Sequence, residues 1–283
     1  MIDTNFQQKF SQVAILGATN SGKSTLINKI IGTKVSIISR KVQTTRSCIR
    51  GVKSIGNSQL VFLDTPGFFT PTKNTDALLI RSIWAEIRTA DLILLLIDPN
   101  KEFNRDFYSI LSRLKKIKKN KYVAINKIDK VNKKKLLPIM DFLKHKNIFK
   151  EIFLISALKG NGLDSLLTSF VKEAKKGLWL FPKGVLTDLK KGDLASEITR
   201  EKIYDRLHQE IPYQIVVKTE EWKEKKGNTV VIFQSIYVKK EKQKHIVIGK
   251  KGAVIKSISI AARKDMKKIF RKNVSLYLKV KYK

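Results

Sequence analysis

The sequence is short of acidic side chains and of cysteine. It has 24 aspartates and glutamates against 58 lysines and arginines, a formal net charge of +34 at pH 7. Such an excess of positive charge points to a polyanionic partner. The single cysteine, Cys48, excludes an intramolecular disulfide, and we therefore expect a reducing, cytoplasmic setting.

Long apolar runs are also missing. The longest run covers residues 92–97, whereas a membrane-spanning helix needs about 20 apolar residues. A run of this length is typical of a parallel strand buried on both faces. The first eight residues have neither the basic start nor the apolar stretch of a signal peptide. With 42% hydrophobic residues in 283, we expect a folded chain of two domains.

The positive charge is concentrated towards the C-terminal end. Residues 212–283 carry 20 lysines and arginines against 5 acidic residues, and the charge density there is more than twice that of the preceding 211 residues. This concentration favours a nucleic-acid partner for the C-terminal part, or a membrane surface rich in anionic lipid.

Strand and helix patterns alternate through the first 175 residues, which predicts an α/β domain with a doubly wound, mostly parallel sheet. The predicted strands cover residues 13–16, 48–55, 60–64, 92–98, 122–126 and 152–156. The predicted helices cover residues 23–31, 77–89, 103–115, 133–145 and 162–175. Ligands of such sheets bind beyond the carboxyl ends of the strands.

A glycine-rich motif, G-x-x-x-x-G-K-S, lies between the first predicted strand and helix. This context predicts a P-loop, whose backbone N–H groups and following helix bind a polyphosphate. The lysine of the motif would reach the β and γ phosphates, and the serine hydroxyl would bind Mg²⁺. The predicted nucleotide-binding residues here are Gly17, Ala18, Thr19, Asn20, Ser21, Gly22, Lys23, Ser24 and Thr25.

The third predicted strand ends in Asp64, Thr65, Pro66 and Gly67. A carboxylate at this point can hold Mg²⁺ through water, and the Gly67 N–H can bond a γ-phosphate. A Pro-Gly turn after a strand would account for the last two residues alone, but it does not account for the aspartate.

The fifth and sixth predicted strands end in residues that can read a base. Asn126, Lys127 and Asp129 follow the fifth strand. A carboxylate can accept hydrogen bonds from N1 and N2 of guanine, which adenine cannot offer, so the nucleotide is predicted to be GTP or GDP. At the end of the sixth strand a backbone N–H could meet guanine O6; the residues are Ser156, Ala157 and Leu158.

These motifs, in this order, resemble the G domain of the translation-factor-like GTPases. Between the first two, residues 39–46 resemble switch I of the Era family of bacterial GTPases. The resemblance implies that Ser24, Asp64 and a switch I threonine, Thr45 or Thr44, hold Mg²⁺. It also implies that Lys23, Thr45 and Gly67 act in transition-state stabilisation and switching, with no general base.

Two positions bear on how such an enzyme would hydrolyse GTP. Phe68 stands where Ras-type enzymes carry the glutamine that orients the attacking water, so slow turnover is expected. Asn20 matches an asparagine with which relatives bind K⁺, an ion that can replace the positive charge of an arginine finger. An ordinary loop asparagine is the alternative interpretation of Asn20.

The C-terminal region predicts a second, α+β domain. Helices are predicted at 194–207, 242–248 and 253–270, and strands at 211–217, 229–238 and 274–280. Its G-x-x-G turn sits between the last two helices in an apolar frame, and the whole pattern resembles the prokaryotic-type KH domain. In such a turn the glycines allow backbone N–H groups to approach an RNA backbone closely, the lysines face phosphates, and the isoleucines line a groove for about four bases. The residues are Ile248, Gly249, Lys250, Lys251, Gly252 and Ile255.

The resemblance to the Era family covers nearly the whole chain. We expect a G domain at 1–176, a linker at 177–192 and a KH domain at 193–283, which ends close to the last predicted strand. The resemblance implies a monomeric cytoplasmic GTPase that acts in small-subunit assembly. Its KH domain would bind the 3′ end of 16S rRNA, with peripheral contact to the anionic inner membrane. Two alternatives stay open, a GTP-binding assembly factor with negligible hydrolysis and a membrane-surface protein.

Overall fold

The computed structural model describes residues 7–38, 49–67, 74–207 and 215–282. Its contacts divide the chain into two compact units. One unit comprises Met1–Ser36 and Thr45–Asp188, and the other comprises Ile37–Thr44 and Leu189–Lys283. Within the described ranges, no helix is both long enough and apolar enough to cross a membrane.

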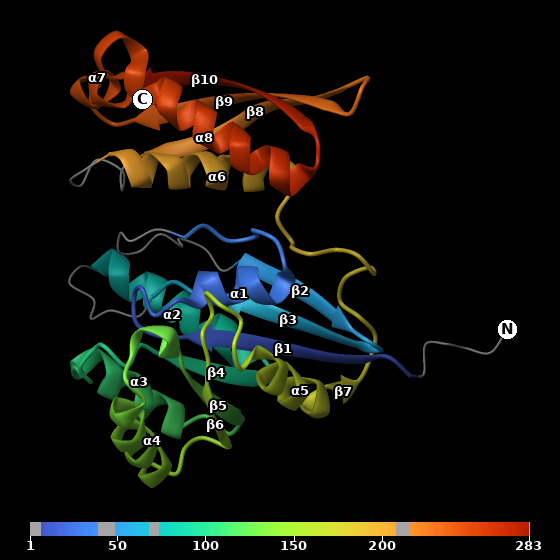
Figure 1. The fold of residues 1–283 in the computed structure, drawn as a ribbon, viewed down its shortest axis with the longest axis vertical. Coiled ribbons are helices and arrows are strands. Elements are labelled where there is room, and N and C mark those ends of the chain that lie inside the picture. The colour runs from blue at the N-terminus through green and yellow to red at the C-terminus, as the bar shows by residue number, and fades with distance from the viewer. Residues whose placement is uncertain (1–6, 39–48, 68–73, 208–214, 283) are drawn as a thin grey trace, which may run out of the picture. The chain divides into compact units, whose positions relative to one another are not determined.

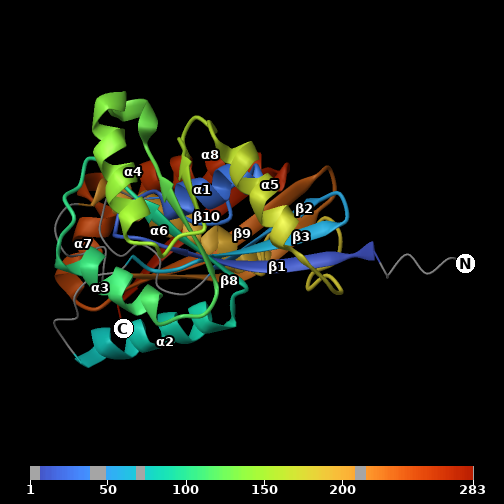
Figure 2. The same ribbon diagram turned by 90° about the horizontal axis from the view of Figure 1, so that it is seen from below.

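The first unit is built on a central, mostly parallel sheet, which confirms the predicted α/β fold (Figures 1 and 2). The strand order is β2-β3-β1-β4-β5-β6, with β2 antiparallel to β3 and the short β7 antiparallel to β1. The strands are β1 (Lys9–Leu16), β2 (Ile49–Ile55), β3 (Ser58–Asp64), β4 (Leu92–Ile97), β5 (Asn120–Ile125), β6 (Glu151–Leu154) and β7 (Lys175–Lys176).

Helices cover both faces of this sheet. Successive strand residues point to opposite faces, so each central strand contributes to two apolar cores. Val13 and Ile15 of β1 pack with α1 (Lys23–Ile31) and α5 (Leu163–Glu173). Ala14 and Leu16 pack on the other face, where the core is closed by α2 (Asn74–Thr89), α3 (Arg105–Lys115) and α4 (Leu136–His145). All of β4 is buried, as its unbroken apolar sequence predicts.

The segment after β7 lies along the first unit. Phe181 N–H donates to Gln59 Oε1 at 3.0 Å, and Gln59 Nε2 returns a bond to the Phe181 carbonyl at 2.8 Å. Thr187 forms a β-bridge with Gly51 of β2. Residues 177–188, the first part of the predicted linker, therefore belong with the first unit by their contacts.

The second unit is a three-stranded sheet with helices, in the order that the KH resemblance implies. β10 runs parallel to β9, and β9 is antiparallel to β8. The elements are α6 (Lys191–Arg206), β8 (Val216–Lys225), β9 (Thr229–Val238), α7 (Glu241–Ile248), a 3₁₀ turn (Lys250–Gly252), α8 (Ala253–Phe270) and β10 (Asn273–Tyr282).

The strand predicted at 211–217 overlaps the observed strand at Val216 and Val217. β8 begins at Val216 and continues through a charged stretch to Lys225, while residues 211–214 lie outside the described part of the chain. β8 is an edge strand, and most of its side chains are exposed. An edge strand can carry charged side chains without burying them, and such charges also discourage pairing with other chains. The charged part of β8, residues 218–225, has no continuous apolar pattern from which a strand could be predicted.

Candidate nucleotide-binding site and RNA-binding loop

The P-loop joins the end of β1 to the start of α1, as the motif predicts. Two of its glycines are required by space. A Cβ on Gly17 would lie 2.4 Å from the Leu96 carbonyl oxygen, and one on Gly22, whose φ is +103°, would lie 2.4 Å from Asn126 Nδ2. The loop is therefore pressed against the ends of β4 and β5, and only glycine lets it approach so closely.

Lys23 is buried at the first position of α1. Its ammonium donates to the carbonyls of Gly17 and Ala18, both at 3.0 Å, so the side chain is curled back over the loop. Burial lowers the pKa of Lys23 to about 8, although the negative charge of Asp64 acts in the opposite direction. The ammonium is thus held over the loop, where a phosphate chain would meet it.

Asp64 ends β3 as a fully buried carboxylate. Its Oδ2 accepts hydrogen bonds from Ser24 Oγ at 2.7 Å and from Ser36 Oγ at 2.5 Å. Burial raises the pKa of Asp64, and the two serine hydrogen bonds and Lys23 oppose that rise. Its other oxygen, Oδ1, accepts no hydrogen bond from the described residues. A buried carboxylate oxygen beside a serine hydroxyl fits the oxygen ligands that Mg²⁺ prefers.

Ser36 is a member of this site that the sequence reasoning missed. The side chain of Asn28 on α1 accepts hydrogen bonds from the N–H groups of Val35 and Ser36 at 2.8 and 2.9 Å. This places the Ser36 hydroxyl against Asp64 across the end of β3. No local motif marks the contact, because it depends on how the chain after α1 folds back.

Thr65, Pro66 and Gly67 leave β3 beside the P-loop. Thr65 Oγ1 donates to the Ile15 carbonyl at 2.6 Å, which ties this segment to β1. A Cβ on Gly67 would lie 2.6 Å from Thr19 Cγ2, so the two predicted phosphate-contacting segments touch. Phe68 and the switch I candidates Thr44 and Thr45 lie outside the described residues.

The predicted base-reading residues come together at the ends of β5 and β6. Asn126 Nδ2 donates to the Ser21 carbonyl, and Asn126 Oδ1 accepts from the Ala157 N–H, both at 2.8 Å. Ser156 Oγ donates to Asp129 Oδ1 at 2.6 Å, and this hydrogen bond lowers the pKa of Asp129. Asp129 is therefore held as a carboxylate, the form that accepts hydrogen bonds from guanine. Leu158 is exposed beside them.

The predicted Lys127 braces the P-loop from its other side together with two residues, Asp98 and Lys101, that were not predicted. Lys127 Nζ donates to the Asn20 carbonyl at 2.8 Å and to the buried Asp98 at 2.7 Å. Lys101 Nζ donates to the Thr19 carbonyl at 2.7 Å. A signal was available for Asp98, since it follows β4 at the same edge of the sheet as the other site residues.

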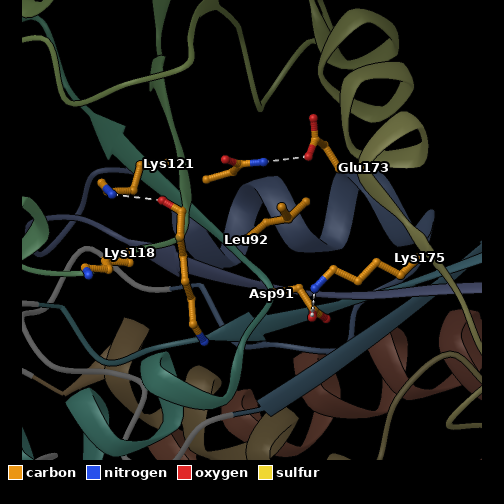
Figure 3. A pocket seen from close by; sticks show the side chains of 8 residues that line it. Asp91, Leu92, Lys118, Lys121, Glu173 and Lys175 are labelled. Atoms are coloured by element: carbon orange, nitrogen blue, oxygen red, sulfur yellow. Dashed lines mark hydrogen bonds and ion pairs between the residues drawn. The ribbon is translucent and has the colours of Figure 1, made fainter.

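A separate cavity of about 580 Å³ lies at the opposite edge of the sheet, where β4 and β5 begin (Figure 3). Several of its polar groups are already bonded within the unit. Asn120 donates to Glu173 at 2.6 Å, Asp91 accepts from the Gln12 N–H at 2.9 Å, and Lys175 lies 3.8 Å from Asp91. These contacts join strand starts to α5 and β7, and we assign them to the fold.

The G-x-x-G loop of the second unit connects α7 to α8. Gly249 and Gly252 have φ of +74° and +77°, and Lys250 and Lys251 between them are exposed. Ile248 and Ile255 are half-buried against the core of the unit. The glycine N–H groups are already donated to His245 and Gly249 carbonyls. The exposed side chains of Lys250 and Lys251 are therefore the positive groups that the loop presents to solvent.

Comparisons with known proteins agree with both sites. Residues 12–127 match the family described as 50S ribosome-binding GTPase, and residues 210–283 match the KH domain. GTPase Era of Agrobacterium fabrum is 45% identical over 95% of this chain and 85% of its own length. GTPase Era of Rhizobium meliloti is 44% identical over 95% of this chain and 86% of its own.

Two solved structures are similar over nearly the whole chain. A variant of Aquifex aeolicus Era bound to GDP·AlF4⁻ has a TM-score of 0.90 and 41% identity. Era in complex with MgGDPNP and nucleotides 1506–1542 of 16S ribosomal RNA has a TM-score of 0.89 and 41% identity. Each comparison covers 98% of this chain and 94% of the other. The two matched domains and these relatives show that the chain belongs to the Era family of GTPases.

Proposed function

We propose that this chain binds and slowly hydrolyses GTP and binds the 3′ end of 16S ribosomal RNA through its KH domain, acting in assembly of the small ribosomal subunit. One observation supports this most directly. The chain has a guanine-reading phosphate site and a G-x-x-G loop, and it is similar along its length to an Era chain that binds MgGDPNP and nucleotides 1506–1542 of 16S rRNA.

The residues of the first unit divide the task of holding GTP. Asp129, oriented by Ser156, accepts hydrogen bonds from guanine, and Asn126 locks the base-reading loop to the P-loop through Ser21 and Ala157. Lys23 supplies positive charge to the β and γ phosphates. Ser24 and Asp64, with Thr45 or Thr44, would hold Mg²⁺, which neutralises phosphate charge during transfer.

Hydrolysis then depends on charge and on the position of the attacking water. No glutamine follows Gly67, since Phe68 stands there, and we therefore propose slow intrinsic turnover. We also propose that K⁺ binds at Asn20. Its backbone has φ of +61°, and its carbonyl is held by Lys127. Hydrolysis should rise in KCl relative to NaCl, and an Asn20→Ala variant should lose that difference. Phosphate release that neither K⁺ nor RNA stimulates would favour the assembly factor with negligible hydrolysis.

The second unit would hold RNA by charge and by apolar contact. Lys250 and Lys251 would bind phosphates across the G-x-x-G loop, while Ile248 and Ile255 line the adjoining groove for unstacked bases. We propose that the protein acts as a monomer in the cytoplasm. Peripheral contact with an anionic membrane is favoured by Leu178 and Leu180, which are 70% and 55% exposed beside Lys176 and Lys183.

A charge inserted into the G-x-x-G loop tests whether the two sites are separate. Gly252→Asp should abolish binding of an RNA of nucleotides 1506–1542, while affinity for GDP stays within about twofold because the P-loop is untouched. Gly227→Asp is the matched control. Its φ is +76° against +77° for Gly252, and a Cβ at either position meets no described atom within 4 Å. Equal loss of RNA and GDP binding in Gly252→Asp would falsify the two-site proposal.

A further inference from the structure

The sheet of the second unit has one face that the helices do not cover (Figure 1). Val230 and Ile232 of β9 point into the core, where they pack with Ala262 and Met266 of α8. Because side chains alternate along a strand, Val231, Phe233, Ser235 and Tyr237 point to the opposite face. On β10 the strand register places Ser275, Tyr277, Lys279 and Lys281 on that same face.

Two aromatic rings lie at the middle of this face. Phe233 and Tyr277 are direct neighbours in the register, and their rings are stacked with centroids 5.0 Å apart and planes 14° from parallel. They are 36% and 57% exposed, respectively. Packing of the core does not explain this pair, because both aromatic side chains remain exposed to solvent.

Lysines surround the rings. Lys223 Nζ lies 5.7 Å from the Phe233 ring centroid, and Lys281 Nζ lies 5.5 Å from that of Tyr237. The strand register places three more lysines on this face: Lys218, Lys225 and Lys279. None of the three forms an ion pair with a described residue. The two acidic residues here, Glu221 and Glu220, are engaged by Lys223 at 2.7 Å and Lys281 at 3.6 Å.

We propose that this face is a second RNA-binding surface, on which bases of single-stranded RNA stack against Phe233 and Tyr277 while the lysines contact phosphates. Exposed aromatic rings within a positive surface are how sheets bind single strands with little sequence preference. Each ring of the stacked pair has one face and one edge turned away from the other ring, and the lysines beside the pair bring positive charge to an RNA backbone there.

The position of β10 connects this surface to the G-x-x-G loop. β10 is an edge strand of the sheet, and α7, which leads into the loop, packs against it. A strand of RNA that leaves the loop therefore reaches the edge of β10 and can cross to its open face. The inference rests on the proposed function, because it takes the RNA on this face to be a continuation of the 16S RNA strand bound at the G-x-x-G loop.

Ring substitutions test the proposal with the full-length protein and an RNA of nucleotides 1506–1542. Base–aromatic stacking is worth about 1–3 kcal/mol per base, so Phe233→Ala and Tyr277→Ala should each weaken binding about 5- to 100-fold. Tyr277→Phe keeps the ring and should bind within about twofold of the unchanged protein. Tyr277→Leu keeps an apolar side chain without a ring and should behave like Tyr277→Ala.

Tyr108→Ala is the matched control, because Tyr108 is 48% exposed but lies on α3 of the other unit. It should leave RNA affinity unchanged. If the ring variants fold poorly, ultraviolet crosslinking of the unchanged protein to the same RNA gives a second measurement. Nucleotides should attach to the peptides of β9 and β10 that carry Phe233 and Tyr277, and attachment to the G-x-x-G loop alone would overturn the proposal.

The outcomes separate this inference from the proposed function. If Gly252→Asp abolishes RNA binding while all ring variants bind like Tyr108→Ala, the second surface is wrong and the KH proposal stands. If the unchanged protein does not bind the RNA, both fail. If the ring variants retain RNA affinity but lose capture of a protein partner, the face binds protein and the inference is overturned.

Discussion

The two glycine-rich loops of this chain serve phosphates in opposite ways. At the P-loop the charged groups are buried and already bonded: Lys23 of the loop donates to two carbonyls, and Asp64 at the adjoining end of β3 accepts from two serines. In the G-x-x-G loop Lys250 and Lys251 are exposed. Buried, fixed groups suit one small ligand of defined shape, because a misfit would leave them unpaired. Exposed lysines suit a polymer, because they bind any phosphate that comes within reach.

The glycines differ in the same sense. Gly22 is required by space, because a Cβ there would meet Asn126, whereas Gly252 is required by its backbone alone, with φ of +77° and no described atom near a Cβ. Substitutions in the P-loop should therefore act through its contacts, and those in the G-x-x-G loop through charge. The following predictions test this difference, beginning with the largest expected effect.

Asp64→Asn should lower the rate of GTP hydrolysis about 100- to 1,000-fold, since it removes a carboxylate that would hold Mg²⁺ and an ion in this position contributes several kcal/mol. The amide keeps the shape and can still accept from Ser24 and Ser36. Burial raises the pKa of Asp64, so loss of its charge should not destabilise the fold.

The measurements for this variant are phosphate release and thermal unfolding. We expect the melting temperature to be equal to or higher than that of the unchanged protein, and binding of the 16S fragment to be retained. A variant that melts earlier and hydrolyses GTP normally would show that Asp64 serves the fold rather than the metal.

Gly22→Ala should weaken GDP binding about 100-fold, because the added methyl group must displace the Asn126 amide and break its bond to the Ser21 carbonyl. Gly32→Ala is the control. Gly32 also has a positive φ, +82°, but a Cβ there meets no described atom within 4 Å. It should cost about 1 kcal/mol of folding free energy and leave GDP affinity unchanged. Titration calorimetry would decide, and equal affinities for the two variants would contradict the contact argument.

The ammonium of Lys23 should make GDP binding sensitive to pH. Burial lowers its pKa from the ordinary 10.5 to about 8, so the free protein loses this charge as pH rises through 8. GDP affinity should fall about tenfold between pH 7 and 9, because binding then requires uptake of a proton. Lys23→Arg keeps its charge throughout, and its affinity, however weak, should stay constant. A flat profile for the unchanged protein would contradict this prediction.

The same shift affects stability with the opposite sign. Between pH 8 and 10.5 the unfolded chain carries a proton on Lys23 that the folded protein has released. The contribution of Lys23 to the free energy of unfolding therefore rises with pH over this window. Chemical denaturation at several pH values would separate this effect from the loss of GDP affinity.

The parts of the fold and site that are predictable from sequence are those written in local patterns. The helix α1 and the buried strand β4 depend on neighbouring residues, and the structure confirms both. The predicted site motifs lie at the ends of their strands. The guanine-reading cluster was also accessible, because parallel strands bring their carboxyl ends to one edge. Asn126, Asp129 and Ser156 indeed meet there, although 27 to 31 residues separate the bonded positions.

What could not be predicted depends on contacts without a local pattern. Ser36 reaches Asp64 only because Asn28 folds the following chain back. The strand β8 carries charges because it is an edge, and its position in the sheet is not visible in its own sequence. Phe233 and Tyr277 are 44 positions apart and become a pair only through the parallel register of β9 and β10.

The smallest predicted effect concerns Ser156 and sharpens the contrast between fixed and exposed groups. Ser156→Ala removes the 2.6 Å hydrogen bond that orients Asp129 and lowers its pKa. Asp129 itself remains, so GDP affinity should fall only about 5- to 10-fold, an effect of about 1 kcal/mol. Ser169→Ala removes a bond of the same length, from Ser169 to the exposed Glu151, and should change nothing. If both variants bind GDP alike, orientation of Asp129 does not contribute to guanine recognition. If only Ser156→Ala weakens binding, the orientation of Asp129 contributes to guanine recognition.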